Sequence, residues 1–120
     1  MVLIDTSVWV SHLREGSAQL KALLNEGTVV CHPFVIGELA CGTIRNRALI
    51  FSLLQSLPVA DTAEHSEVLQ FIEHNRLAGK GLGYVDVHLL ASAVLTGVSL
   101  WTFDIKLQQA SAKLRIDYKL

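Results

Sequence analysis

The sequence is poor in the residues typical of disulfide-bonded, secreted or linker-containing proteins. It has two cysteines, two prolines and one methionine among 120 residues, and charged residues make up only 18%. Cys31 and Cys41 lie ten positions apart, without the paired Cys or His spacing of a zinc site or a redox motif. We therefore expect two reduced thiols. The hydrophobic share of 51% excludes a disordered tail, because disordered chains are poor in apolar residues.

The sequence also lacks a long uncharged run and a basic N-terminus. The longest stretch without Asp, Glu, Lys, Arg or His covers residues 89–103. As a helix it would span about 22 Å, short of the roughly 30 Å hydrocarbon core of a membrane. The opening residues, 1–5, contain no base before the first acid, unlike a signal peptide. We expect a cytoplasmic protein without a membrane span.

No repeat, low-complexity tract or linker interrupts the chain, so residues 1–120 are predicted to form one domain. Short apolar runs alternate with amphipathic segments, which indicates an α/β fold with a parallel sheet. Strands are expected at 2–4, 28–31 and 98–102, with two further short strands at 57–59 and 115–118. Helices are expected over 6–13, 18–25, 33–41, 44–56, 62–77, 84–96 and 104–113.

The charge balance is close to neutral, and the positions of the acids matter more than their sum. Ten Lys and Arg residues against eleven Asp and Glu residues give a formal net charge of −1, so no overall basic field points to nucleic acid. Most of the acids stand in polar or mixed surroundings and are expected at the surface: Glu15, Glu26, Asp61, Glu64, Glu67, Glu73 and Asp117.

The other four acids, Asp5, Glu38, Asp86 and Asp104, stand in apolar segments. A buried charge costs several kcal/mol unless it is paired or bound to a metal. No lysine or arginine lies within four positions of the first three, and only Lys106 is that near the last. One alternative is that each acid caps a helix or pairs with a distant arginine.

Two of these acids, Asp5 and Asp104, each follow a predicted strand and should therefore emerge at the same sheet edge. Glu38 and Asp86 fall in the first turns of predicted helices. Carboxylates gathered at one edge repel each other unless a cation neutralises them, and oxygen ligands alone select Mg²⁺ or Mn²⁺. Carboxylate-held Mg²⁺ is suited to cleaving or transferring phosphate esters.

Four segments, each containing one of these acids, resemble the PIN-domain ribonucleases, and in particular the VapC toxins of bacterial toxin–antitoxin pairs. They are residues 4–10, 35–39, 83–91 and 100–107, in the order of the family's motifs. The resemblance covers nearly the whole chain. One departure is Phe103, which occupies a position that is often basic in close relatives.

The resemblance implies a PIN-like three-layer α/β/α domain with a mainly parallel, twisted sheet of four to five strands. It implies a Mg²⁺- or Mn²⁺-dependent endoribonuclease in which Asp5, Glu38, Asp86 and Asp104 hold the metal and orient a water for attack on an RNA phosphate. Thr6, Ser7 and Thr102 would hydrogen-bond carboxylates or phosphate around it. The implied partners are a VapB-type antitoxin, whose tail would cover the site, and a second copy of the chain in a homodimer.

Four cations are candidate phosphate contacts, although a solvated face is an alternative role for each: Arg45, Arg47, Lys80 and Lys106. Setting the four acids of the site aside leaves the rest of the chain at a formal +3. Such a mildly basic body can accept an RNA backbone once a metal is bound.

Two rival functions fit the same composition. A response-regulator receiver domain has this size and clustered acids, but would need a phospho-accepting aspartate after a middle strand and a lysine after the last one. A non-catalytic PIN-fold binding scaffold would not need all four acids.

The remaining polar and aromatic features point to structure more than to chemistry. The five histidines show no ligand spacing, and the glycine-rich segment 79–83 lacks the spacing of a phosphate-binding P-loop. We expect a mobile loop there. Trp9, Phe34 and Trp101 are expected in the core.

Overall fold

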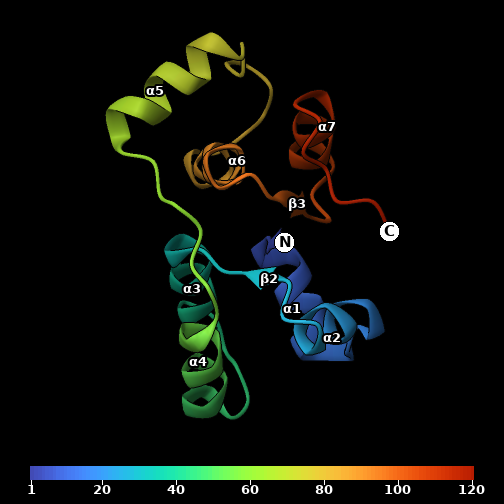
Figure 1. Cartoon of the computed structure of the whole chain (residues 1–120). Helices are drawn as coiled ribbons and strands as arrows, with labels where there is room; N and C mark the ends of the chain where they lie inside the picture. Colours follow the sequence, from blue (N-terminus) through green and yellow to red (C-terminus); the bar gives the residue numbers. More distant parts are fainter.

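A small parallel sheet organises the structure, a computed structural model that describes all 120 residues. Its strand order is β2-β1-β3, with β1 at Val2–Ile4, β2 at Val29–Val30 and β3 at Ser99–Trp101 (Figure 1). Val2 pairs with Val29 on one side and with Ser99 on the other, and all pairings are parallel. All three residues of β1 are buried, as expected for a central strand covered on both faces.

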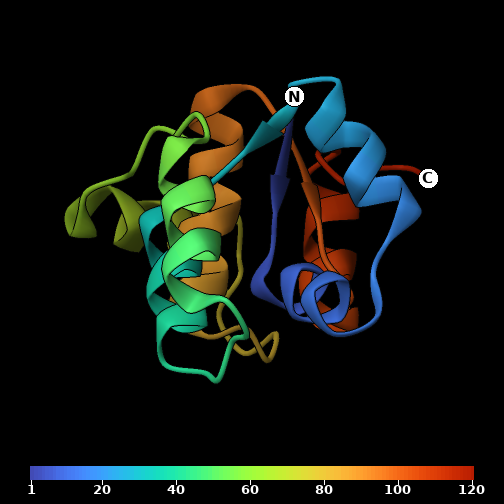
Figure 2. The same cartoon turned by 90° about the horizontal axis from the view of Figure 1, so that it is seen from below.

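Helices cover both faces of this sheet. In Figure 2, α1, α2 and α7 lie on one side of the strands and α3, α4, α5 and α6 lie on the other, which confirms the predicted three-layer α/β/α arrangement. The helices are α1 (Thr6–Glu15), α2 (Ala18–Asn25), α3 (Pro33–Ala40), α4 (Arg47–Ser56), α5 (His65–His74), α6 (Tyr84–Thr96) and α7 (Ile105–Lys113). No helix combines the length and the apolar character needed to cross a membrane.

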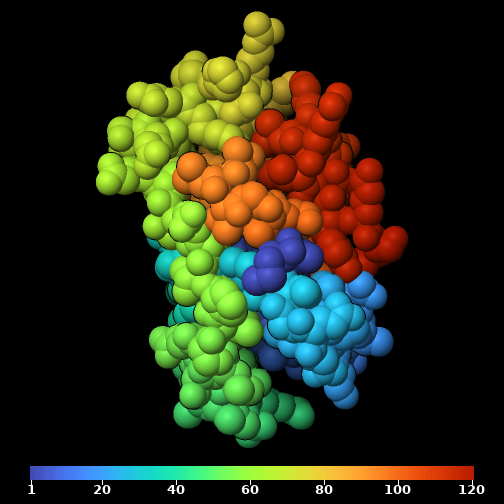
Figure 3. Space-filling view, in the orientation of Figure 1, coloured from blue at the N-terminus to red at the C-terminus, as the bar shows by residue number.

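The most deeply inserted helix is α6. Its residues 87–93 are buried without a break, and it packs against β3 and α5. On the face shown in Figure 3, the orange segment that contains the end of α6 surfaces between the segments of α5 and α7. Full burial of one Val or Leu side chain contributes about 1.5–3 kcal/mol. This packing therefore holds α6 in place, together with Asp86 in its first turn.

The sheet has three strands, fewer than the predicted four to five. The segments expected as additional strands make only single parallel bridges, Cys31 to Val59 and Leu100 to Asp117. Each is held by two backbone hydrogen bonds, such as those from Cys31 to Pro58 O and from Ala60 to Cys31 O. Pro58 has no N–H to donate, which limits the first of these segments as a strand.

Helix starts are the other point of difference. The helix expected from residue 44 begins at Arg47, because Asn46 adopts a left-handed backbone with φ 53°. The helix expected over 62–77 is shorter and covers only α5. It begins after Glu64, whose N–H donates to the Glu67 side chain at 2.9 Å.

Candidate active site

The four acids singled out in the sequence lie at the carboxyl end of the sheet. Asp5 follows β1 and Asp104 follows β3, and each is the N-cap of the next helix, α1 and α7. Asp86 lies in the first turn of α6, and Glu38 lies in the second turn of α3. Three of the four therefore sit at a helix N-terminus, where the helix dipole favours a negative charge.

Asp86 lies within the electrostatic influence of the other three carboxylates. Burial raises the pKa of Asp86, a hydrogen bond from the Gly83 backbone lowers it, and the charges of Asp5, Asp104 and Glu38 raise it further. A net upward shift of the pKa means that the ionised form is disfavoured. The fold thus brings together four negative charges from segments far apart in the sequence, and Asp86 responds to the other three.

Asp5 is the most elaborately held of the four. Its Oδ2 accepts hydrogen bonds from Ser7 Oγ and Thr102 Oγ1, both at 2.7 Å. The same hydroxyls accept from the next turn: Ser7 Oγ from the Phe103 N–H at 3.0 Å and Thr102 Oγ1 from the Asp104 N–H at 3.0 Å. The two hydroxyls therefore join the turn after β1 to the turn after β3, and set Asp5 relative to Asp104.

The other three carboxylates are each held by a single hydrogen bond. Thr6 Oγ1 donates to Glu38 Oε1 at 2.6 Å, the Gly83 N–H to Asp86 Oδ2 at 2.9 Å, and the Leu107 N–H to Asp104 Oδ1 at 2.9 Å. In all four acids one carboxylate oxygen accepts these bonds and the second oxygen accepts none. No donor is a lysine or arginine, so the second oxygens remain available to a ligand.

The four acids stand in apolar segments of the sequence, but only Asp5 is buried in the structure, at 7% exposed. Asp86 is half-buried, and Glu38 and Asp104 are exposed. Leu39 beside Glu38 and Val87 beside Asp86 are buried, since helical neighbours face different directions, whereas Phe103 and Ile105 beside Asp104 are exposed with it. The helix-capping alternative holds for Asp5, Asp86 and Asp104, but capping uses one oxygen of each.

The donor set fits a hard cation in chemistry, since it consists of carboxylate oxygens. The side chains are too far apart, however, to form a finished site. No three His, Cys, Asp or Glu side chains are close enough together to hold one metal ion as they stand. A cation would have to draw the carboxylates inward, and the exposed Glu38 and Asp104 have the room to move.

The four candidate phosphate contacts do not form one cluster. Arg47 donates to Gly42 O at 3.1 Å and to Ala40 O at 2.7 Å, and its guanidinium lies over the Phe51 ring, 4.9 Å from the ring centre. Arg47 therefore ties the α3–α4 connection together. Lys106 lies against the backbone of Gly81, while Lys80 and Arg45 are exposed.

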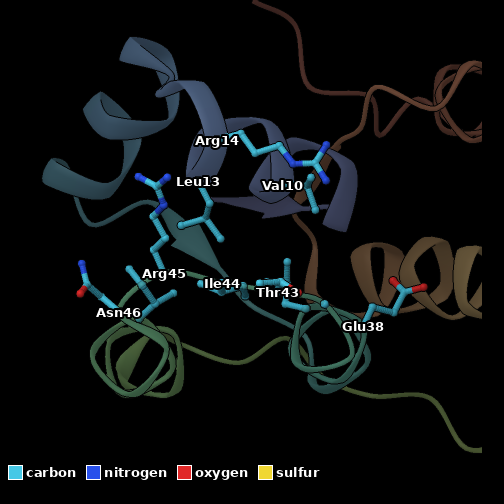
Figure 4. A pocket seen from close by; sticks show the side chains of 11 residues that line it. Val10, Leu13, Arg14, Glu38, Thr43, Ile44, Arg45 and Asn46 are labelled. Atoms are coloured by element: carbon cyan, nitrogen blue, oxygen red, sulfur yellow. The ribbon is translucent and has the colours of Figure 1, made fainter.

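One residue near the site was missed in the sequence. Arg14 lines a cavity of about 620 Å³ together with Arg45 and Glu38 (Figure 4). Its position could have been inferred from the sequence. Thr6, Val10 and Arg14 recur every four residues, which places them along one face of α1. Thr6 at one end of that face is the hydrogen-bond donor to Glu38.

Histidines and aromatic side chains pack between α3 and α6 beside the acids. His32 Nδ1 accepts from the Phe34 N–H at 3.0 Å, so Nε2 holds the proton and donates to Ser92 Oγ at 3.1 Å. Burial and the nearby His88 lower the pKa of His32 to about 4. His88 is buried, and its Nδ1 has no hydrogen-bond partner. Its ring meets those of Phe34 and Tyr84 edge-on, with 4.6 Å between ring centres.

The three aromatic residues expected in the core differ in exposure. Phe34 is 38% exposed, so its assignment to the core was wrong, whereas Trp9 and Trp101 are buried as expected.

The PIN domain family profile matches residues 2–113 of this chain. This chain belongs to the PIN-domain family. It is 46% identical over 114 residues to the protein named Ribonuclease VapC32 in two strains of Mycobacterium tuberculosis, an alignment that covers 94% of this chain and 92% of that relative. The sequence resemblance to PIN domains of the VapC type is thus confirmed, and the receiver-domain alternative is wrong.

Two solved structures share the fold of this PIN domain at low identity. FitAcB from Neisseria gonorrhoeae superimposes with a TM-score of 0.64 at 21% identity, over 93% of this chain and 94% of that one. PAE2754 from Pyrobaculum aerophilum gives a TM-score of 0.61 at 19% identity, over 91% of this chain and 78% of that one. At such identities the comparison establishes the α/β architecture alone.

Proposed function

We propose that this PIN-domain protein is a Mg²⁺- or Mn²⁺-dependent endoribonuclease that hydrolyses phosphodiester bonds in RNA. The observation that supports it most directly is the group of Asp5, Glu38, Asp86 and Asp104, each with one carboxylate oxygen free of hydrogen bonds. The ribonuclease name of its 46% identical relative agrees with this activity.

In this proposal the four carboxylates hold the metal ion and the surrounding hydroxyls position them. A bound Mg²⁺ or Mn²⁺ would polarise the phosphate and lower the pKa of the attacking water. Ser7 and Thr102 fix one oxygen of Asp5, so that its other oxygen faces the site in a set direction. Thr6 does the same for Glu38. Such outer hydrogen bonds orient metal ligands and maintain their basicity.

We further propose that the protein acts as the toxin of a VapBC-type pair in the cytoplasm, with a VapB-type antitoxin as partner and a homodimer as the working form. The name of the VapC relative supports the pairing. The antitoxin would inhibit by covering the carboxylate group, since that is where RNA must enter. Co-purification of the chain with the product of the neighbouring reading frame, followed by mass determination of the complex, tests both partner and copy number.

Cleavage of a structured RNA by the purified protein tests the activity. With Mg²⁺ or Mn²⁺ we expect cleavage, and with EDTA none. Asp5→Asn and Asp86→Asn should each lower the rate by about a hundredfold or more, because each removes a charged ligand of a site that acts as a unit. Asp61→Asn and Asp117→Asn are matched controls, since both acids lie outside the site, and they should cleave at the wild-type rate.

Two results would contradict the proposal. Equal cleavage by wild type and Asp86→Asn would mean that the activity arises elsewhere or from a contaminant. Absence of both cleavage and Mn²⁺ binding by calorimetry would instead favour the non-catalytic binding scaffold.

A further inference from the structure

The cavity beside Glu38 has the lining of a ligand site and not of a packing defect. Its volume of about 620 Å³ lies within the roughly 300–1,000 Å³ of small-molecule pockets. The floor is aliphatic and includes Leu13 of α1 and Ile44 of the α3–α4 connection, and Thr43 and Asn46 add polar groups. In Figure 4 these side chains come from α1 on one side and from the α3–α4 connection on the other.

Two guanidinium groups stand at this cavity without partners in the chain. Arg14 and Arg45 are both exposed and donate no hydrogen bond within the protein, whereas the neighbouring Arg47 donates two to backbone carbonyls. Figure 4 shows them on either side of Leu13, with Arg45 beside Asn46 and Arg14 toward Glu38. Two uncompensated cations over an apolar floor are complementary to an anion that also has an apolar part.

The cavity adjoins the carboxylate group at one residue. Glu38 belongs to both, and Thr6, its hydrogen-bond donor, lies on the same face of α1 as Val10 and Arg14. Eight residues of helix separate Thr6 from Arg14, a span of about 12 Å. Two other cavities, of about 440 and 340 Å³, contain none of the four carboxylates and at most one arginine each.

We propose that this cavity binds the nucleotide next to the cleaved phosphodiester, with Arg14 and Arg45 contacting phosphate and the aliphatic floor and Thr43 receiving the unstacked base. The inference rests on the proposed ribonuclease function. An RNA strand that crosses the carboxylate group must place its next phosphate and base to one side, and this cavity offers a cation for the first and an apolar surface for the second. Bases of single-stranded RNA are read in this way, splayed out of the stack.

Binding of a short fluorescent single-stranded RNA of random sequence tests the phosphate contacts. All variants are made in an Asp86→Asn background with Mn²⁺ present, so that the RNA is bound and not cut, and Kd is measured by anisotropy across a salt series. Arg14→Ala and Arg45→Ala should each weaken binding about tenfold. Each should also reduce the slope of log Kd against log salt by about 0.7. Arg14→Lys keeps the charge and should keep the slope.

A matched control removes one positive charge elsewhere. Lys113 lies at the far end of α7 from Asp104, and Lys113→Ala should leave both Kd and the salt slope unchanged.

The base pocket is tested separately in the active protein, where Thr43→Trp would fill the cavity. Cleavage of a random RNA library by Thr43→Trp should lose the wild-type preference at one position beside the cut, whereas Arg14→Ala should slow cleavage of all sequences alike.

Unchanged Kd and salt slope in both arginine variants would overturn the inference. If the same variants then fail to bind the antitoxin, the cavity is assigned to a protein partner instead. A wild-type protein that neither binds nor cleaves RNA would overturn the proposed function itself, so the two failures are distinguishable.

Discussion

At the residue scale, a few hydroxyl groups determine the geometry of the candidate site. Thr102 is 6% exposed, and its Oγ1 donates to Asp5 at 2.7 Å while accepting from the Asp104 N–H at 3.0 Å. A threonine is suited to this position because its hydroxyl is both donor and acceptor. One side chain therefore sets the relative positions of two carboxylates from different segments.

Thr102→Val should weaken Mn²⁺ binding about 10- to 100-fold, as the loss of an outer hydrogen bond to a metal ligand typically does. Valine keeps the shape of threonine but cannot hold Asp5 or the Asp104 backbone. Calorimetric titration with Mn²⁺ measures the effect. Thr28→Val is the matched control, because the Thr28 hydroxyl donates to Leu23 O, away from the acids. Equal affinity in the two variants would show that Thr102 has no part in positioning the ligands.

At the scale of elements, the turn before each helix sets the position of the carboxylate at that helix N-terminus. The loop before α6 contains Gly79 and Gly81, both with positive φ, at 73° and 77°. A Cβ on Gly81 would lie 2.5 Å from Cδ and Nζ of Lys106, whereas a Cβ on Gly79 would meet nothing within 4 Å. The loop that leads to Asp86 therefore lies against the side chain of Lys106, which belongs to the first turn of α7.

Gly79→Ala and Gly81→Ala separate backbone strain from this packing. Both should lose about 1–2 kcal/mol of stability, because an L-residue is disfavoured at positive φ. Only Gly81→Ala should in addition displace Lys106 and lower the RNA cleavage rate. Urea denaturation and cleavage assays of the two variants provide the comparison. Equal loss of activity in both would mean that contact between the loop and α7 is unimportant for the site.

At the scale of the whole molecule, the residues that stabilise the fold are largely different from those of the candidate site. The core comprises 25 buried apolar residues contributed by strands and helices from both halves of the chain. None of the four carboxylates belongs to it. The buried polar connection between α3 and α6 is formed by His32 and Ser92, next to this core.

Folding stability should fall in weak acid because of His32. Its pKa is about 4 in the folded protein, below the ordinary 6.5, so between these values the unfolded chain takes up a proton that the folded chain does not. Stability is therefore unaffected above pH 6.5 and decreases by about 3 kcal/mol as the pH falls toward 4.

Urea denaturation at about pH 7.5 and about pH 4.5 measures this decrease. His32→Asn, which can still cap α3 but does not titrate, should reduce the difference between the two conditions. His74→Asn, at an exposed position of α5, should leave it as in wild type. If His32→Asn shows the wild-type difference, acid sensitivity arises from other groups.

Much of the fold and the identity of the acids could be predicted from local pattern. The apolar run of β1, the helix caps at Asp5 and Ser17, and the helix over 84–96 all follow from periodicity and capping chemistry, which act over a few neighbouring residues. The four acids were recognisable because each interrupts an apolar segment, three of them with no lysine or arginine within four positions. Family membership follows from the same segments, and the family profile confirms it.

Only the tertiary structure decided how these residues meet. The second oxygen left free on each carboxylate, the exposure of Glu38 and Asp104, and the cavity that joins Arg14 to Arg45 all depend on contacts between segments distant in sequence. The number of strands also depends on the tertiary structure, since residues 57–59 and 115–118 each make only a single bridge to the sheet. Local sequence determines which way a side chain leaves its own helix or strand, whereas the distance between two such side chains is set by packing across the core.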